Sequence, residues 1–559
     1  MFYLLVLVCA LAPVFGQEQT LQVNITQGIV QGSIAPDGIY YTFYGVHYAG
    51  APVGQNRFKA PTPAPSYPGV LIAHDRDVIC AQPSSRGLVG TEDCLVLNIF
   101  TNATTPAKPV LVWLIGEEYT NTEQTARSFR RLVQEGVVIV ELNYRVSIFG
   151  FLCLRTPEAP GNAGLKDVVQ GLKWIKENIA AFGGDPNNVI LFGHGSGAAM
   201  VDLITMSPSA NGLVHKAIAQ SGSALAPWAV SYDPIGYAQE FGSKLGYTGK
   251  TNAELAQLLV TTDVSLLIPA MNDFEFYNNT ILFAPCIEDP NLNSNETFLT
   301  AAPSDILKSR NYSHIPYIAG YTDREGTIRA QQAAYGNWLD KMETNFTLFL
   351  QADLDLGNNA SAVEKSIREF YFSQRTINME TIEDYLDYQG DTLILVSVIR
   401  GARERALTSR AEVRLFEFGY RGTQNSDWAY QTIPLTGARH GSVLNFLLDY
   451  DLRPMDEPVM TSLINRYVAF FNTGVPNATW LPITGNSLQY MLYSGSDGPQ
   501  PLTALFREEP RVNPHTQRMD FWNNLYSKYY VPPKFTNSGE NLVGVTLILF
   551  VSQLLTRLF

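Results

Sequence analysis

Positive charge is scarce in this sequence. Its 559 residues contain 39 Lys and Arg against 52 Asp and Glu, which gives a formal net charge of −13 and a pI near 5.1. Nucleic acids and anionic lipid headgroups both reward basic patches, so this balance argues against both as partners. An acidic surface also has an ordinary explanation in solubility. We therefore expect no nucleic-acid partner.

Cysteine and histidine are also rare, with five and seven residues. None of them form a group with the spacing of a zinc site, so we expect no metal site and no cofactor. The natural disulfide pair is Cys80 with Cys94, as expected for an oxidising compartment. Cys153 and Cys286 are either a second bridge or two buried thiols, and their spacing leaves both readings open.

Linkers, charge blocks, low-complexity runs and fixed-period repeats are absent from the interior of the chain. With 46% apolar residues the chain can bury a sizeable core. We therefore predict one large domain, residues 17–530.

The start of the chain is apolar, and sequons follow it. The run "FYLLVLVCALAPVFG", with Val14 and Gly16 before a cut at Gln17, predicts a signal peptide over residues 1–16; the alternative is a buried core helix. Eight Asn-x-Ser/Thr sequons suggest a glycosylated surface. They lie at Asn24, Asn102, Asn278, Asn295, Asn311, Asn345, Asn359 and Asn477.

The end of the chain is apolar as well. Its run within 542–559 is about 22 Å long as a helix, against about 30 Å of hydrocarbon, which is short for a membrane span. Small residues from Asn537 onward suit a GPI anchor attached there, with 531–541 as a short stalk. A short membrane-inserted tail and an amphipathic helix packed on the body are the alternatives. We expect a protein tethered to the extracellular face of the plasma membrane, or else secreted.

Short apolar runs alternate with helical patterns along the interior. The stretch 164–183, for example, repeats apolar residues every three or four positions, as a helix does. Strand, helix, strand repetition predicts an α/β fold with a large, mainly parallel sheet flanked by helices, and functional residues at the carboxyl ends of its strands. Buried strands are predicted for 109–115, 136–145, 188–193, 315–321 and 412–420.

The stretch "LFGHGSGA", residues 191–198, joins a predicted strand to a predicted helix. A nucleophile elbow, G-x-S-x-G, needs glycines two residues before and after the nucleophile because its turn is sharp. Gly193 and Gly197 occupy these positions, so the residue at the nucleophile position is Gly195. Ser196 comes one position later, and we expect its hydroxyl to make a helix-start hydrogen bond.

These motifs together resemble the type-B carboxylesterase and cholinesterase family of α/β-hydrolases, over roughly residues 20–530. The resemblance is carried by "YGVHYAGAPVGQNRF", "EDCLVLNI", "NYRVSIFGFL", "APGNAGLKD", "ENIAAFGGDPNNVILFG" and "QRMDFWNNLY". It implies the α/β-hydrolase fold and three structural pairs, namely Cys80 with Cys94, Arg57 with Glu92, and Arg145 with Asp167.

The resemblance also assigns triad positions. The family's acid lies in a G-x-x-x-x-E-G segment, matched here by "GYTDREG", which makes Glu325 the acid. Its histidine lies in an H-G segment, matched by "GARHGSVLNFLL", which makes His440 the base. With Gly195 at the nucleophile position, two of the three members remain, and a structural hydrogen bond between them is a sufficient explanation for their survival.

The oxyanion hole departs from the family's H-G-G-G-F. Here Glu117 and Glu118 follow Gly116, and they add bulk and negative charge where negative charge must develop. We therefore interpret these three residues as a degenerate oxyanion hole and expect no ordinary ester turnover.

Neuroligins, neurotactins, gliotactins and glutactins belong to this family, lack catalytic residues and act as adhesion or receptor ectodomains; "FGHGSGA" is similar to the neuroligin elbow. The resemblance implies a catalytically silent glycoprotein that binds another extracellular or cell-surface protein. Two alternatives stay open: a carrier of small apolar ligands in the remnant gorge, and an ester hydrolase with an altered site that uses Ser196 or a water. A homodimer through helices within 456–473 and 514–528 is also left open.

Overall fold

The computed structural model describes residues 20–535, apart from 85–86, 103–105, 123–127, 250, 293–295, 423–432, 434, 436, 449–453, 486 and 496–505. The predicted signal peptide, the sequon at Asn295, the predicted anchor site at Asn537 and the apolar tail 542–559 therefore lie outside the described residues.

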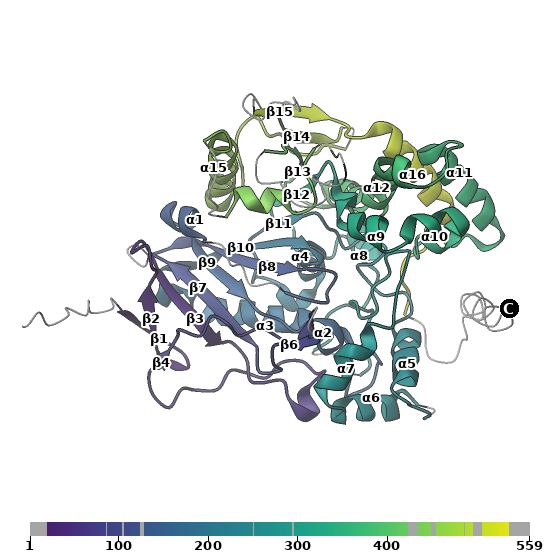
Figure 1. The fold of residues 1–559 in the computed structure, drawn as a ribbon. Coiled ribbons are helices and arrows are strands. Elements are labelled where there is room, and N and C mark those ends of the chain that lie inside the picture. The colour runs from purple at the N-terminus through teal and green to yellow at the C-terminus, as the bar shows by residue number, and fades with distance from the viewer. Residues whose placement is uncertain are drawn as a thin grey trace, which may run out of the picture.

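A single large sheet organises the described part of the chain (Figure 1). Its thirteen strands run in the order β1-β2-β3-β7-β9-β8-β10-β11-β12-β13-β14-β15, with β4 beside β2, and β5 and β6 form a separate hairpin. The strands from β9 to β14 pair in parallel, and antiparallel strands lie at both edges. The predicted mainly parallel sheet is confirmed, and all five predicted strands are present.

The strand bounds are β1 (Thr20–Ile25), β2 (Gly28–Ile34), β3 (Tyr41–His47), β4 (Leu71–Ile72), β5 (Gln82–Ser84), β6 (Gly87–Val89), β7 (Val96–Thr101), β8 (Lys108–Gly116), β9 (Val138–Leu142), β10 (Gly184–Gly195), β11 (Lys216–Gln220), β12 (Tyr317–Thr322), β13 (Val413–Gly419), β14 (Gln489–Ser494) and β15 (Arg507–Val512). The helix bounds are α1 (Arg130–Gln134), α2 (Ser147–Phe151), α3 (Ala163–Asn178), α4 (Ser196–Met206), α5 (Pro234–Lys244), α6 (Asn252–Thr261), α7 (Val264–Met271), α8 (Pro303–Ser309), α9 (Ala330–Tyr335), α10 (Trp338–Thr344), α11 (Ala360–Phe372), α12 (Ile382–Gly390), α13 (Val396–Thr408), α15 (Glu457–Thr473) and α16 (Thr516–Tyr529).

The central strands read as continuous apolar runs because both of their faces are buried. Alternate residues of a strand point to opposite faces. On β8, Val110, Val112 and Leu114 join one apolar cluster, whereas Leu111 and Trp113 join the other. In Figure 1, α3 and α4 cover one side of the central strands, and α1 and α15 lie on the other. This two-sided burial fixes where the strand ends, and hence the site, must lie.

Two disulfides and two buried ion pairs brace the region around the first half of the sheet. The predicted Cys80–Cys94 bridge is present, and Cys153 and Cys286, left open by the sequence, form the second bridge. The implied ion pairs are also present, Arg57 with Glu92 and Arg145 with Asp167, each with a closest N–O distance of 2.6 Å.

The seven described sequons all have some solvent access. Four asparagines are exposed, namely Asn24, Asn311, Asn345 and Asn359. The other three are partly buried, namely Asn102, Asn278 and Asn477. Glycosylation stays a prediction that these positions allow.

The predicted stalk begins against the body of the protein. The Val531 N–H donates to the Asp353 carbonyl at 2.9 Å, and the Arg155 guanidinium lies 4.5 Å from the Phe535 ring centroid. Residues 531–535 are therefore docked rather than free.

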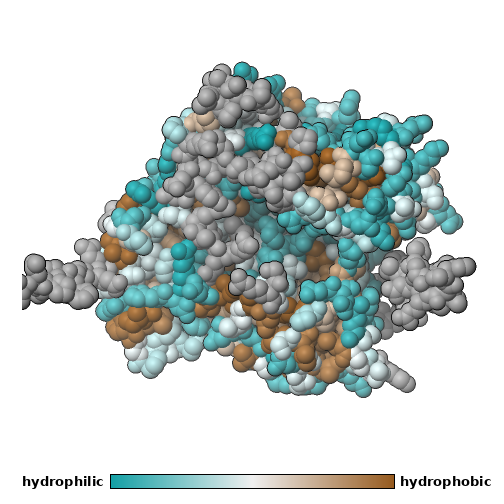
Figure 2. Space-filling view, viewed as in Figure 1, coloured by the Kyte–Doolittle hydropathy of each residue, from teal (hydrophilic) through white to brown (hydrophobic). Residues whose placement is uncertain are grey.

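Within the described ranges, no single helix has the length and apolar character needed to cross a membrane. The adjoining helices α6 and α7 reach that length and composition only together, and a bend of 117° separates them. Figure 2 shows a mostly hydrophilic face on which apolar residues gather over these two helices.

Candidate functional site

The elbow keeps its backbone shape at the junction of β10 and α4. Gly195 has φ +59° and ψ −125°, and α4 begins at the next residue. A Cβ at Gly193 would lie 2.2 Å from the Gly197 carbonyl oxygen, and a Cβ at Gly197 would lie 2.4 Å from the Leu114 carbonyl oxygen, so the flanking glycines are required by close backbone packing.

The space above Gly195 is bordered by Gly116 and Glu117. A Cβ at this position would lie 3.2 Å from the Gly116 carbonyl oxygen and 3.3 Å from Oε2 of Glu117. Both contacts are tighter than most real Cβ contacts, and a serine hydroxyl would extend further still. A side chain at position 195 would therefore crowd the Gly116 carbonyl, and the Glu117 carboxylate would have to shift by a few tenths of an ångström to admit it.

Ser196 is committed to the protein scaffold. Its hydroxyl donates to the Gly116 carbonyl at 2.7 Å and accepts the Tyr119 N–H at 3.1 Å, and the residue is 2% exposed. The predicted helix-start hydrogen bond is wrong, because Ser196 is the first residue inside α4 and its hydroxyl turns sideways to the loop after β8. It links the start of this helix to that loop.

Glu325 and His440 do meet, as the resemblance implies. The Nδ1 of His440 lies 2.5 Å from Oε2 of Glu325. The other carboxylate oxygen accepts the Ser221 hydroxyl at 2.6 Å and the Thr322 N–H at 2.7 Å. Glu325 lies three residues after the end of β12 and is 2% exposed, so these bonds hold a buried carboxylate.

The loop after β8 does not present an open oxyanion hole. The Glu117 N–H donates to the Asn121 carbonyl at 3.1 Å, and the Tyr119 N–H is taken by Ser196. The Glu118 side chain pairs with Arg329. Of the two glutamates, only Glu117 faces the triad positions, and its side chain is 40% exposed.

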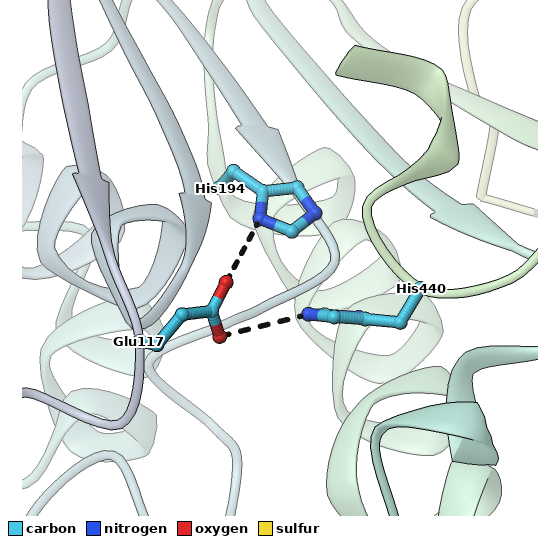
Figure 3. A group of neighbouring side chains, drawn as sticks. All are labelled: Glu117, His194 and His440. Atoms are coloured by element: carbon cyan, nitrogen blue, oxygen red, sulfur yellow. Dashed lines mark ion pairs between the residues drawn. The ribbon is translucent and has the colours of Figure 1, made fainter. Parts of the chain in front are cut away.

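Glu117 bridges two histidines (Figure 3). Its Oε1 lies 3.7 Å from Nδ1 of His194, and its Oε2 lies 3.8 Å from Nε2 of His440. The two imidazole rings have centroids 4.7 Å apart. Sequence reasoning assigned no role to His194, although its place between the elbow glycines Gly193 and Gly195 was a signal that its side chain lies at a strand end.

The charged forms of Glu117, Glu325 and His440 stabilise one another. Burial lowers the pKa of His440, but the carboxylates of Glu325 and Glu117 raise it by more, to about 10. Burial raises the pKa of Glu117, but His194 and His440 lower it by more, to well below its usual range. The pKa of Glu325 is also lowered overall, since the interactions with His440 outweigh its burial. At neutral pH His440 is therefore an imidazolium between two carboxylates, which leaves it no free lone pair with which to accept a proton.

This sheet, the elbow at the end of β10, and the acid and histidine on later loops define an α/β-hydrolase with a rebuilt site. The crystal structure of juvenile hormone esterase from Manduca sexta, with OTFP covalently attached, has the same fold, with a TM-score of 0.80 at 24% identity over 91% of this chain and 100% of that one.

The chain belongs to the carboxylesterase family, whose sequence model matches residues 19–522. It is similar to human carboxylesterase 3, with 32% identity over 495 residues, 82% of this chain and 84% of that protein. It is also similar to venom carboxylesterase-6 of Apis mellifera, with 26% identity over 84% of this chain and 89% of that protein.

Proposed function

We propose that this carboxylesterase-family protein does not hydrolyse esters through an acyl-serine intermediate and acts instead as a recognition ectodomain for another extracellular or cell-surface protein. One observation carries the first half of the proposal. Position 195 is glycine and offers no nucleophile, and the Glu117 carboxylate crowds the space beside it.

Three requirements of acyl transfer fail together at this site. Residue 195 offers no hydroxyl, the only serine beside it is bonded into the scaffold, and the Glu117 N–H is occupied by Asn121. Losing the nucleophile of a triad costs about 10⁶-fold in a well-studied serine protease, and losing one oxyanion donor costs about 10²- to 10³-fold. The negative charge of Glu117 adds repulsion to an oxyanion.

The recognition role is supported by what the chain retains. The whole sheet and both disulfides are kept while the reactive position is not, which favours a fold used as a binding surface. The exposed sequons and the predicted leader and anchor suit the cell surface. Helices α15 and α16, which cover the segments considered for a homodimer, are both formed.

A second candidate is an altered hydrolase, and the retained Glu325–His440 hydrogen bond favours it. Its weakness is the charge state of His440, because an imidazolium cannot act as the general base for a water at neutral pH.

The absence of ester hydrolysis is tested by measuring turnover of a p-nitrophenyl ester by the full chain after treatment with a chelator. We expect the native protein, Gly195→Ser and His440→Ala all to remain at background. The double variant, Gly195→Ser with Glu117→Gly, should exceed Gly195→Ser by about 10²-fold, because the change at 117 clears space beside the serine and removes a charge at the oxyanion position. A fluorophosphonate probe, which labels activated serines, should mark only the double variant. If the native protein turns over ester faster than His440→Ala, or if the probe labels the native protein, the proposal that it does not hydrolyse esters is refuted.

The test of recognition uses cells that display the full chain. We expect saturable adhesion to cells that carry a partner, equal for the native protein and for His440→Ala, and lost after the displayed protein is cleaved from the surface. Adhesion that is absent, or that depends on His440, contradicts the recognition role.

A further inference from the structure

We propose that Glu117, His194 and His440 form a binding site for a divalent zinc ion. This goes beyond the recognition role and does not depend on it. The sequence gives no metal-site spacing, and the site exists only because the fold brings together the loop after β8, the end of β10 and the loop that carries His440.

The geometry of the three side chains is close to that of a metal site. Their candidate ligand atoms all lie within 4.8 Å of one another. A tetrahedral zinc ion at about 2.0–2.1 Å from each ligand separates neighbouring ligand atoms by about 3.3 Å. The two Glu–His separations, 3.7 and 3.8 Å, involve different carboxylate oxygens, and single ligand atoms of the three residues lie within 4.8 Å of one another. To bind zinc, one Glu117 oxygen has to rotate toward both rings, and the rings have to close in to the tetrahedral spacing. Figure 3 shows one carboxylate oxygen directed at each ring.

The histidine nitrogens are left without hydrogen bonds. Among the described residues, neither ring nitrogen of His194 has a hydrogen-bond partner, nor does Nε2 of His440. His194 is only 1% exposed, and burying unpartnered polar atoms is costly. A metal ion between the rings would displace the Nε2 proton of the His440 imidazolium into solvent, bind one nitrogen of each ring and neutralise the Glu117 carboxylate.

Glu325 holds the proposed metal ligand His440 in position. The hydrogen bond from Nδ1 of His440 to Glu325 fixes the ring and directs Nε2 at the site. Metal-binding histidines commonly donate their other N–H to a carboxylate in this way. Ser221 and Thr322 in turn hold Glu325 in place. The pair that once served a nucleophile is thus arranged as a carboxylate–histidine support for a metal.

The donor set and the access route both suit zinc. Two imidazoles and one carboxylate are a common zinc ligand set, with a fourth position for water. The 40% exposure of the Glu117 side chain gives an entry path, whereas His194 closes the inner side. The absent side chain at Gly195 leaves the room that the carboxylate uses.

The experiment is a titration of the chelator-treated full chain with Co²⁺, whose visible absorption reports tetrahedral binding, followed by displacement with Zn²⁺. We expect one tetrahedral site per chain in the native protein and none in His194→Leu, which should still fold because neither ring nitrogen of His194 has a hydrogen-bond partner in the part of the chain that the structure describes. Glu325→Gln should weaken binding by about 10- to 100-fold, because it removes the carboxylate that orients the His440 ring. His47→Ala is the matched control, because His47 also faces a carboxylate, that of Asp93 at 3.5 Å on the surface, and should bind as the native chain does.

Absence of stoichiometric tetrahedral binding in the native chain, or equal binding by His194→Leu, overturns the site. The ester assay tests the proposed function separately. Ester turnover by the chelator-treated chain would refute the proposal that the protein does not hydrolyse esters, and it would not affect the proposed metal site. Turnover that appears only with Zn²⁺ and vanishes in His194→Leu would support the metal site and replace the silent reading with a metal-dependent hydrolase.

Discussion

Two clusters of charge lie inside this molecule, and they are built differently. At Arg145, the guanidinium donates to both carboxylate oxygens of Asp167 at 2.6 and 2.7 Å, and to the carbonyls of Arg57 at 3.0 Å and Lys59 at 2.7 Å. At Glu117, the contacts to two histidines are 3.7 and 3.8 Å long, and three ring nitrogens make no hydrogen bond within the described structure.

The difference separates a structural cluster from a site. Arg145 and Asp167 satisfy each other at 2% and 0% side-chain exposure. The Glu117 cluster keeps charge and unused ligand atoms next to a partly exposed carboxylate. A protein tolerates the second arrangement at a cost in stability, which is typical of functional sites.

The largest expected effect comes from breaking the satisfied cluster. Arg145→Ala leaves the Asp167 carboxylate buried and unpaired, and should lower the free energy of unfolding by about 3–5 kcal/mol. Urea unfolding measures it. The control is Arg511→Ala, which removes an exposed pair with Glu509 and should cost at most about 1 kcal/mol. If the two variants lose the same free energy of unfolding, the expected difference between the buried and the exposed ion pair is wrong.

A smaller effect is expected in how the stability contributed by His440, in the Glu117 cluster, depends on pH. The pKa of His440 is about 10 in the folded protein against an ordinary 6.5, so its contribution to stability is fully present below about pH 6.5 and is lost as the pH rises through about 10. The stability advantage of the chelator-treated native chain over His440→Gln should therefore shrink between about pH 6.5 and about pH 9.5. Urea midpoints of both proteins at the two pH values measure it. An advantage that grows with pH would mean that His440 is neutral in the fold.

The smallest effect concerns the unsatisfied ring. His194→Leu should change the free energy of unfolding of the metal-free protein by no more than about 1 kcal/mol, because removal of a buried ring without hydrogen-bond partners among the described residues is offset by the loss of its attraction to Glu117. Thermal melts under chelation measure this. A large destabilisation would show that His194 is a structural residue like Arg145.

The sequence predicted the framework well, for a physical reason. Strands such as β8 are buried on both faces, so their apolar runs identify them without knowledge of their neighbours. The disulfide of Cys80 with Cys94 closes a short loop, and was predictable for that reason. Cys153 and Cys286 are far apart in the chain, and only the fold places them together.

The site was harder to predict because its contacts cross between distant segments. The Glu325–His440 contact followed from the family resemblance. The role of His194 did not, because its meaning depends on how the loop after β8 directs Glu117. Likewise, the wrong partner predicted for Ser196 came from local helix rules, whereas its hydroxyl bonds to the Gly116 carbonyl on another segment.

The position of the Glu117 carboxylate beside Gly195 has a consequence for protein engineering. Serine at 195 alone would crowd the Gly116 carbonyl and the Glu117 carboxylate, and glycine at 117 alone would leave the elbow without a hydroxyl. We therefore expect that a screen of single substitutions would not find a hydrolytic variant of this fold, and that these two positions have to be changed as a pair.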